Sequence, residues 1–244
     1  MPVLDFFPQI DQSSLMILGA AFLVALIIQI IPILFYPFDL FFTMIHELGH
    51  VFTARFSNGL VDGFWVFSNT EGVTDARFPK NSDLSWYISG GYVGTSLFSA
   101  FLILLTGLPE LAPYSLGFLG GLILLLLFLY GKQSKYPKKN VPTVTAIVAV
   151  SFGILLIGVA WLASLIWSIF LLYLLAIQGT ITSLHLVIDD LSMQVLNKQQ
   201  GIDPVVMKER VGCTPMFWVV VWSLLSIFAI GAAFWFTWLR NWPV

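Results

Sequence analysis

The sequence predicts an all-α polytopic membrane protein with about seven transmembrane helices and a short β-hairpin after the second helix. Hydrophobic residues make up 58% of the 244 residues and charged residues only 10%, and the mean hydropathy is +0.91. These charges are too few to cover the surface of a soluble domain. In addition, several uncharged runs reach the roughly 20 residues that a helix needs to cross a bilayer.

The apolar runs divide one integral membrane domain, residues 1–244, into seven expected spans. Because proline disrupts helices, we expect Pro37 to separate the first two. The uncharged stretch from 142 to 188 is long enough for two spans joined by a tight turn. Residues 1–14 contain no Lys or Arg, so we expect no cleavable signal peptide there. The expected spans are 14–36, 38–55, 84–106, 114–130, 142–162, 165–188 and 216–239.

A β-rich loop is expected at residues 56–83, directly after the second span. Asn58-Gly59, Asp62-Gly63 and Glu71-Gly72 are turn signals that border two short strand-like segments, 60–66 and 73–78. These segments predict a β-hairpin. Its edge is able to hold an extended peptide by strand addition, and the alternative is a surface loop without a partner.

The third span begins with a glycine-rich sequence. Gly90 and Gly94 are four residues apart and are flanked by serines. Small residues at this spacing let another helix approach closely in a membrane. The pattern therefore predicts tight helix packing.

The basic residues predict the orientation of the chain. With seven spans, all of them except Arg240 fall in loops on one side, which the positive-inside rule identifies as cytoplasmic. The N-terminus is then predicted inside and the C-terminus outside. Membrane lipid is an expected partner and nucleic acid is not. The basic residues on the predicted cytoplasmic side are Arg55, Arg77, Lys80, Lys132, Lys135, Lys138, Lys139, Lys198, Lys208 and Arg210.

The second span carries the sequence His46-Glu47-Leu48-Gly49-His50. Histidines four residues apart lie on one face of a helix, where both can bind one metal ion, and the adjacent Glu47 is placed to act on a metal-bound water. Ionisable residues inside a membrane usually have a function. A single histidine in such a helix is more often a core residue, but two of the three histidines fall at this spacing, which favours a metal site.

Catalytic zinc usually has three protein ligands and an open position, so a third ligand is required besides His46 and His50. The candidates are Asp189, Asp190, His185 and Asp62. Asp62 lies in an Asp-Gly sequence typical of a turn. We therefore predict that Asp189 or Asp190, at the cytoplasmic end of the sixth span, is the ligand.

His185 precedes Asp189 by one helical turn, so it is expected either to ligate the metal or to hydrogen-bond to the aspartate ligand. The single Cys213 excludes an internal disulfide and a cysteine zinc cluster.

These residue types support hydrolysis of a peptide bond. Zinc lowers the pKa of a bound water to about 7, and Glu47 is expected to take the proton and return it to the leaving amine. Because the site is buried in an apolar segment, a polar cleft near the cytoplasmic face is also required.

The sequence resembles the site-2 protease family of intramembrane zinc metalloproteases, in the small branch of metallopeptidase family fifty. The resemblance runs from about Phe38 to Ile227, and its most specific motif is 46–50. It implies a zinc ion held by two His and an Asp, Glu47 as the base, and transmembrane or membrane-proximal protein substrates. Larger members carry the Asp in an Asp-Gly sequence, whereas Leu191 follows Asp190 here. The other matching segments are 71–74, 90–94, 183–190 and 219–226.

Two other functions compete with the protease. One is a catalytically inactive relative that serves as a membrane scaffold or binding protein. The other is a transporter, which is disfavoured because no inverted repeat is apparent. Metal content separates the scaffold from the enzyme.

Overall fold

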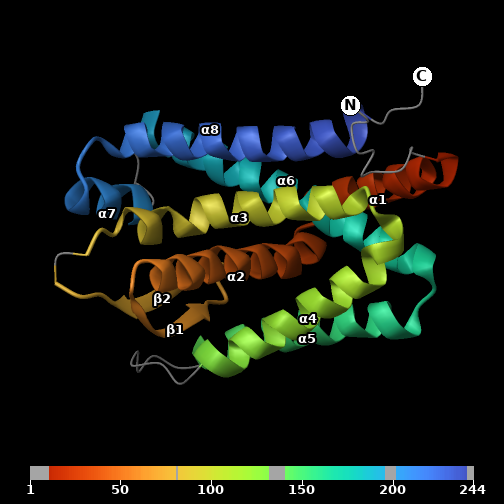
Figure 1. The fold of residues 1–244 in the computed structure, drawn as a ribbon, viewed down its shortest axis with the longest axis horizontal. Coiled ribbons are helices and arrows are strands. Elements are labelled where there is room, and N and C mark those ends of the chain that lie inside the picture. Colours follow the sequence, from red (N-terminus) through yellow and green to blue (C-terminus); the bar gives the residue numbers. More distant parts are fainter. Residues whose placement is uncertain (1–10, 81, 132–140, 196–201, 241–244) are drawn as a thin grey trace, which may run out of the picture.

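The chain folds into a bundle of long helices with one small hairpin (Figure 1). The structure is a computed structural model that describes residues 11–80, 82–131, 141–195 and 202–240. It confirms the polytopic α-helical class with a two-stranded insertion. The elements are α1 (Gln12–Ile30), α2 (Pro32–Phe56), β1 (Leu60–Val66), β2 (Gly72–Arg77), α3 (Ser85–Thr106), η1 (Pro109–Leu111), α4 (Ala112–Tyr130), α5 (Val141–Leu162), α6 (Leu165–Val195), α7 (Ile202–Arg210), α8 (Pro215–Phe234) and the π-helical turn η2 (Trp235–Leu239).

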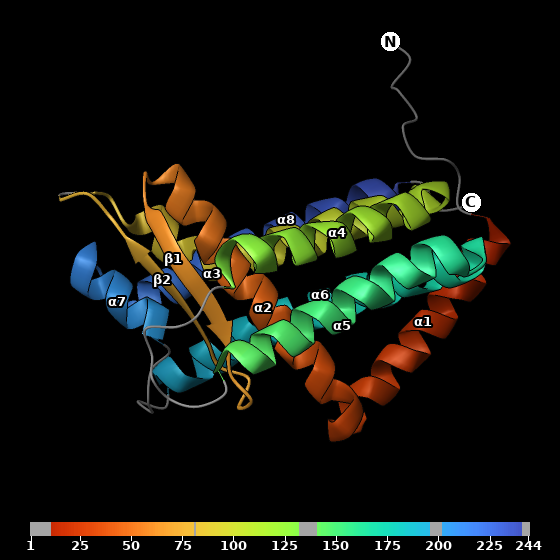
Figure 2. The same cartoon turned by 90° about the horizontal axis from the view of Figure 1, so that it is seen from below.

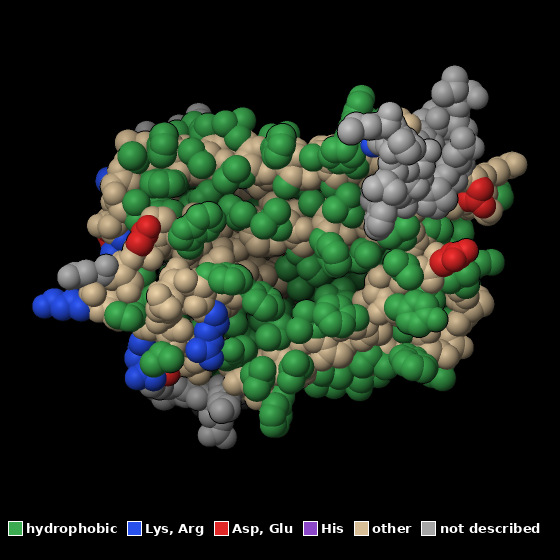
Figure 3. Space-filling view, in the orientation of Figure 1, with side chains coloured by type: hydrophobic (Ala, Val, Ile, Leu, Met, Phe, Trp, Pro, Cys, Tyr) green, Lys and Arg blue, Asp and Glu red, His purple; other side chains and the backbone are tan. Residues whose placement is uncertain are grey.

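Within the described residues, six helical segments are long and apolar enough to cross a membrane: α1, α3, α4 with η1, α5, α6, and α8 with η2. α2 is 25 residues long but is not among them, and it carries Asp39, Glu47 and Arg55. Hydrophobic side chains cover the middle of the face in Figure 3, and charged side chains gather towards the two ends. This distribution is typical of a membrane protein.

The first two helices are separated at Ile31. This residue is extended (φ −103°, ψ 104°), and Pro32 begins α2, because a residue before proline avoids the helical conformation and proline suits the first helical turn. The prediction that Pro37 separates them is wrong, since Pro37 lies inside α2. Membrane helices tolerate an internal proline where neighbouring groups satisfy the freed carbonyl.

α1 and α2 form the two arms of a wide V (Figure 2). The bend lies near the middle of the bundle, because Gln29 Nε2 donates to Gln178 Oε1 at 2.6 Å and Gln178 is midway along α6. The two arms therefore lead together from one end of the molecule to the other.

The start of α1 and the end of α8 lie at the same end of the bundle (Figure 1). Tyr173 of α6 contacts Ser14 in α1, donates to Thr106 O of α3 at 3.1 Å, and packs edge-on against Trp238 of η2 at 5.7 Å. At the other end of the bundle, His50 near the C-terminus of α2 hydrogen-bonds to the carbonyl oxygen of Tyr87 in the first turn of α3.

Most of the described basic residues cluster at the end opposite to the start of α1 (Figure 3). The sequence had predicted the N-terminus beside these basic loops. In the structure the V of α1 and α2 leads from one end of the bundle to the other, so the start of α1 lies away from these basic residues (Figure 1, Figure 3). The described basic residues at this end are Arg55, Arg77, Lys80, Lys208 and Arg210.

The predicted hairpin is confirmed. β1 pairs antiparallel with β2, with Phe64 opposite Thr74 and an irregularity between Val61 and Gly63. The N–H of Val66 at the outer side of β1 donates to Thr145 Oγ1 of α5 at 2.9 Å. The hairpin lies along α2, so it borders the helix that carries the His-Glu motif (Figure 2).

α2 and α3 cross at glycines. A Cβ atom at Gly49 would collide with the backbone of Gly90, and one at Gly94 would come within 2.9 Å of the Gly49 Cα. The prediction of close packing at Gly90 and Gly94 is confirmed. This crossing fixes the depth of the motif in α2 relative to the first turns of α3.

Candidate metal centre

α2 presents its two histidines one turn apart on the same face. The Nε2 atoms of His46 and His50 are 3.3 Å apart, and their ring centroids are 5.0 Å apart. Both side chains are largely buried, with 14% and 7% of their surface exposed. The helical spacing read from the sequence therefore brings these two nitrogens together.

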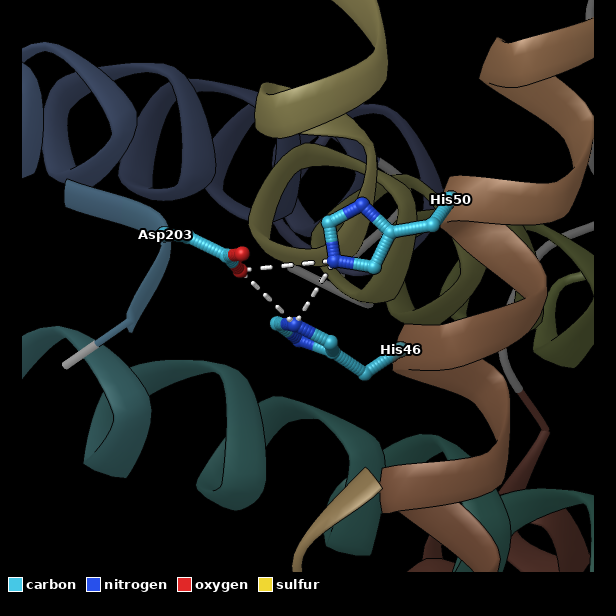
Figure 4. Close-up of side chains that lie close together, drawn as sticks. All are labelled: His46, His50 and Asp203. Atoms are coloured by element: carbon cyan, nitrogen blue, oxygen red, sulfur yellow. Dashed lines mark hydrogen bonds and ion pairs between the residues drawn. The ribbon is translucent and has the colours of Figure 1, made fainter. Parts of the chain in front are cut away.

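A carboxylate from a distant element completes the group. Asp203, in the first turn of α7, places Oδ2 3.3 Å from Nε2 of His46 and 3.3 Å from Nε2 of His50. The three side chains converge on one point (Figure 4). Among the described residues, they are the group of His, Cys, Asp and Glu side chains arranged to hold a metal ion.

The three atoms fit a tetrahedral zinc ion. A Zn²⁺ ion with bonds of about 2.0–2.1 Å separates its tetrahedral ligand atoms by roughly 3.3 Å, which is the spacing of all three pairs here. Two imidazole nitrogens and a carboxylate oxygen are also ligands that suit zinc. The donor set thus agrees with zinc in both chemistry and spacing.

The second ring nitrogen of His50 is anchored on α3. Its Nδ1 donates to the carbonyl oxygen of Tyr87 at 2.8 Å. A ligating histidine needs its other nitrogen held in this way, because the bond fixes the tautomer and leaves the Nε2 lone pair free for the metal. The buried Nδ1 of His46 has no such partner in the described part of the chain.

Gly91 makes room for the ring of His46. A Cβ atom built on Gly91 would run into the Nε2, Cε1 and Cδ2 atoms of this imidazole. Tyr92 packs edge-on against the other side of the ring, at 5.2 Å between centroids. The backbone of α3 thus forms a wall of the centre, and this wall requires glycine.

Glu47 is buried beside the centre, with 5% of its surface exposed. Thr74 Oγ1 in β2 donates to its Oε2 at 2.7 Å. A Cβ atom at Gly72 would collide with the Glu47 carboxylate, so β2 runs directly against this acid. The hairpin both leaves space for the carboxylate and orients it.

The carboxyl group of Asp203 is held in its charged form. Its partly buried position by itself raises the pKa, but the facing His50 and hydrogen bonds from His50 and His46 outweigh this and keep the pKa below the usual range. A charged carboxylate at this position favours binding of a cation.

α7 is held in place by an apolar cluster. Met207 is fully buried and packs with Ile88 and Tyr92 of α3 and Trp222 of α8. Trp218 Nε1 also donates to Gly212 O, just after α7, at 2.7 Å. Asp203 is therefore positioned by the docking of a short helix outside the apolar spans.

The other residues that the sequence suggested as a third metal ligand lie in different parts of the structure. Asp189 and Asp190 belong to α6, but their side chains lie outside the described residues, so their predicted role as ligand is untested. His185 is exposed on α6. Asp62 lies within β1 and accepts two hydrogen bonds of 2.6 Å from Arg77, which assigns it to the hairpin and not to the metal group.

Sequence reasoning missed Asp203 because this residue lies between the expected spans 165–188 and 216–239, where no element was predicted. One local signal was available. Asp203 precedes Pro204, and an acid followed by proline is a common start of a helix. Nothing in this pattern indicates that the helix docks against α2 and α3.

A family model described as Peptidase M50B-like matches residues 19–233. The chain belongs to the Peptidase M50B-like family. The match spans α2, the hairpin, α3 and Asp203, and it agrees with the resemblance drawn from the motifs. Membership in the M50B-like family, together with the six apolar helices, makes the chain an integral multi-pass membrane protein. No curated protein and no solved structure matches the chain.

Proposed function

We propose that the protein is a membrane-embedded zinc metalloprotease that hydrolyses peptide bonds of membrane-spanning or membrane-proximal substrates. The observation that carries the proposal is the triangle of His46 Nε2, His50 Nε2 and Asp203 Oδ2 with edges of 3.3 Å. A buried glutamate adjoins this triangle. Membership of a peptidase family supports the same chemistry.

In this proposal Asp203 is the third ligand, in place of Asp189 or Asp190. Its oxygen is equidistant from both histidine nitrogens, and the tautomer fixed at His50 aims a lone pair at the same point. Two imidazoles and one carboxylate would leave a fourth position open.

The metal ligands, the base and the residue that orients the base would have separate roles in hydrolysis. A zinc ion held there would supply a Lewis acid and lower the pKa of water to about 7. Glu47 would take the proton of the attacking water and pass it to the leaving amine. Thr74 holds one carboxylate oxygen of Glu47 through a hydrogen bond, so the base keeps a fixed orientation.

β2 offers an edge for an extended substrate. Phe67 N donates to Glu71 O at 2.8 Å, so these two residues form a hydrogen-bonded pair. Hydrogen-bonded and non-hydrogen-bonded pairs alternate along antiparallel strands. The Phe64–Thr74 pair of the register is therefore non-hydrogen-bonded, and its backbone N–H and C=O groups point outwards. The outer side of β1 is engaged by Thr145. The side-chain positions of Gly72 and Thr74 in β2 face Glu47, so a peptide added to the outer edge of β2 would lie near this acid, which favours strand addition over a loop without a partner.

The orientation follows from the basic end of the molecule. Because Lys and Arg favour the cytoplasmic side, we propose that the metal centre lies towards the cytoplasm and that the start of α1 and the end of α8 lie on the opposite side. Cleavage would then occur near the cytoplasmic face.

The test is metal content combined with cleavage by the purified protein in detergent. We expect about one zinc per chain, and we expect Glu47→Gln to retain the zinc and the fold but to lose cleavage of a transmembrane peptide. A Gln variant as fast as wild type would exclude Glu47 as the base. A folded protein without zinc would support the inactive scaffold.

A further inference from the structure

Tyr87 lies where the open edge of β2 meets the metal centre. Its hydroxyl donates to the carbonyl oxygen of Thr74 at 2.8 Å. This carbonyl belongs to the pair whose backbone groups point outwards from the hairpin. The Tyr87 hydroxyl thus occupies the carbonyl oxygen to which the N–H group of an added strand would donate.

Thr74 links this edge to the base. Its carbonyl oxygen accepts from Tyr87, and its side-chain hydroxyl donates to Glu47 Oε2 at 2.7 Å. The residue that would pair with substrate is therefore the residue that orients the glutamate. A peptide that binds this carbonyl would therefore lie next to Glu47, because the same threonine contacts both.

Tyr87 serves the metal centre through its backbone and the strand edge through its side chain. Its own carbonyl accepts from His50 Nδ1 at 2.8 Å, while its ring lies against Phe78, at 4.8 Å between centroids. The ring is half-buried in the first turn of α3. A rotation of the side chain would therefore release Thr74 without disturbing the bond to His50.

We propose that Tyr87 is an edge-capping residue. In the substrate-free protein its hydroxyl occupies the Thr74 carbonyl, and an extended peptide displaces it when the peptide pairs with β2. The inference rests on the proposed function, because it specifies how the substrate of that protease is admitted. Capping also shields an unpaired strand edge, which is otherwise prone to pair with other chains.

The test compares two tyrosine-to-phenylalanine variants in the full-length protein in detergent. Tyr87→Phe removes the cap. Tyr36→Phe is the matched control, because the Tyr36 hydroxyl donates to the carbonyl of Ser68 at 2.7 Å, at the hairpin turn and not on the outer edge beside Glu47. Both changes delete one hydroxyl-to-carbonyl bond on the same hairpin.

The probe is a synthetic peptide with one transmembrane helix followed by a fluorescent, β-branched extended segment. Its Kd is measured with Glu47→Gln as background, so that no cleavage occurs. Because a net hydrogen bond changes an equilibrium by a modest factor, we expect Tyr87→Phe to lower Kd roughly 2- to 10-fold and Tyr36→Phe to leave it unchanged. In the active protein, KM falls by a similar factor while kcat and zinc content stay constant.

Amide hydrogen exchange at Gly72 and Thr74 locates the binding. We expect the probe to slow exchange at these positions in both the parent and the Tyr87→Phe protein. An unchanged or higher Kd in Tyr87→Phe, no binding to either protein, or protection elsewhere would overturn the proposal. Tighter binding with protection at β2 in a protein that does not cleave would sustain the capping role and reject the protease function alone.

Discussion

The residues of the metal centre oppose one another unless a cation lies between them. In the deprotonated state that metal binding requires, the lone pairs of His46 Nε2 and His50 Nε2 and the negative charge of Asp203 converge within 3.3 Å of each other. Each is favourable towards a cation and unfavourable towards the other two. The stability of this arrangement should therefore depend on bound metal more than on any contact among the three side chains.

Asp203 is expected to be required for zinc binding. Replacing it with Ala removes a third of the protein ligands, so we expect zinc affinity to fall by more than the roughly 10- to 100-fold that loss of a supporting hydrogen bond costs. Competition with a chelator measures this. Glu209→Ala is the control, because Glu209 is an exposed acid on the same helix. Equal affinity in Asp203→Ala and a loss in Asp189→Ala or Asp190→Ala would restore the sequence prediction.

Gly91→Ala is expected to displace the ring of His46, because the added methyl group would overlap the imidazole. Zinc content should fall while the helical circular dichroism stays close to that of wild type. Gly121→Ala is the matched control, since nothing lies within 4 Å of a Cβ atom there. Normal zinc in Gly91→Ala would show that the wall of α3 can move away.

At the residue scale, the sequence predicted the part of the metal centre that lies on a single helix. His46, Glu47 and His50 share one helix, and their relation follows from 3.6 residues per turn. Asp203 lies 157 residues from His46 along the chain, and its position depends on how α7 packs. Periodicity carries no information about such packing, so no spacing rule identified this aspartate.

At the scale of elements, α7 acts as a separate support for one ligand. It is nine residues long, too short to be stable alone, and it depends on the contacts of Met207 and on the bond of Trp218 to Gly212. The hairpin was predictable because Gly-containing turns border both strands. The break at Ile31 was not, because Pro32 and Pro37 are both possible helix boundaries and only tertiary packing separates them.

Met207→Ala is expected to weaken zinc binding without touching a ligand. Truncating a buried methionine typically costs about 2–5 kcal/mol, and here that loss falls on the docking of α7. We expect faster release of zinc to a chelator and little change in the thermal unfolding of the spans. Val211→Ala is a suitable control, because Val211 is 41% exposed just beyond the same helix. Equal release rates would mean that α7 is held mainly by other contacts.

At the scale of the whole molecule, the V of α1 and α2 puts the start of α1 at the end of the bundle away from the metal centre (Figure 1, Figure 2). α1 starts beside Trp238 and Tyr173, whereas Cys213 is exposed next to α7 at the metal end. Reading each apolar run as a full crossing gave an odd number of spans. Whether a bent pair of helices crosses the membrane once or twice depends on tertiary packing, which composition alone does not reveal.

Thiol labelling with a membrane-impermeant reagent tests this topology. We expect Cys213 to react only from the cytoplasmic side of sealed vesicles. In a Cys213→Ser background, Ser13→Cys and Arg240→Cys, both at exposed positions, should react only from the other side. Labelling of Ser13→Cys from the same side as Cys213 would restore the predicted arrangement with seven crossings.

We expect the bend at Ile31 to make the protein sensitive to the thickness of its bilayer. Little hydrogen bonding is lost at the bend, because Ile31 N donates to Ile27 O and its carbonyl accepts from Leu34 and Phe35, while Pro32 has no N–H to satisfy. We therefore expect the angle between the two arms to adjust as the hydrocarbon region thins or thickens. Since α2 carries His46 and His50, such a change in tilt would alter the depth at which the metal centre meets its substrates.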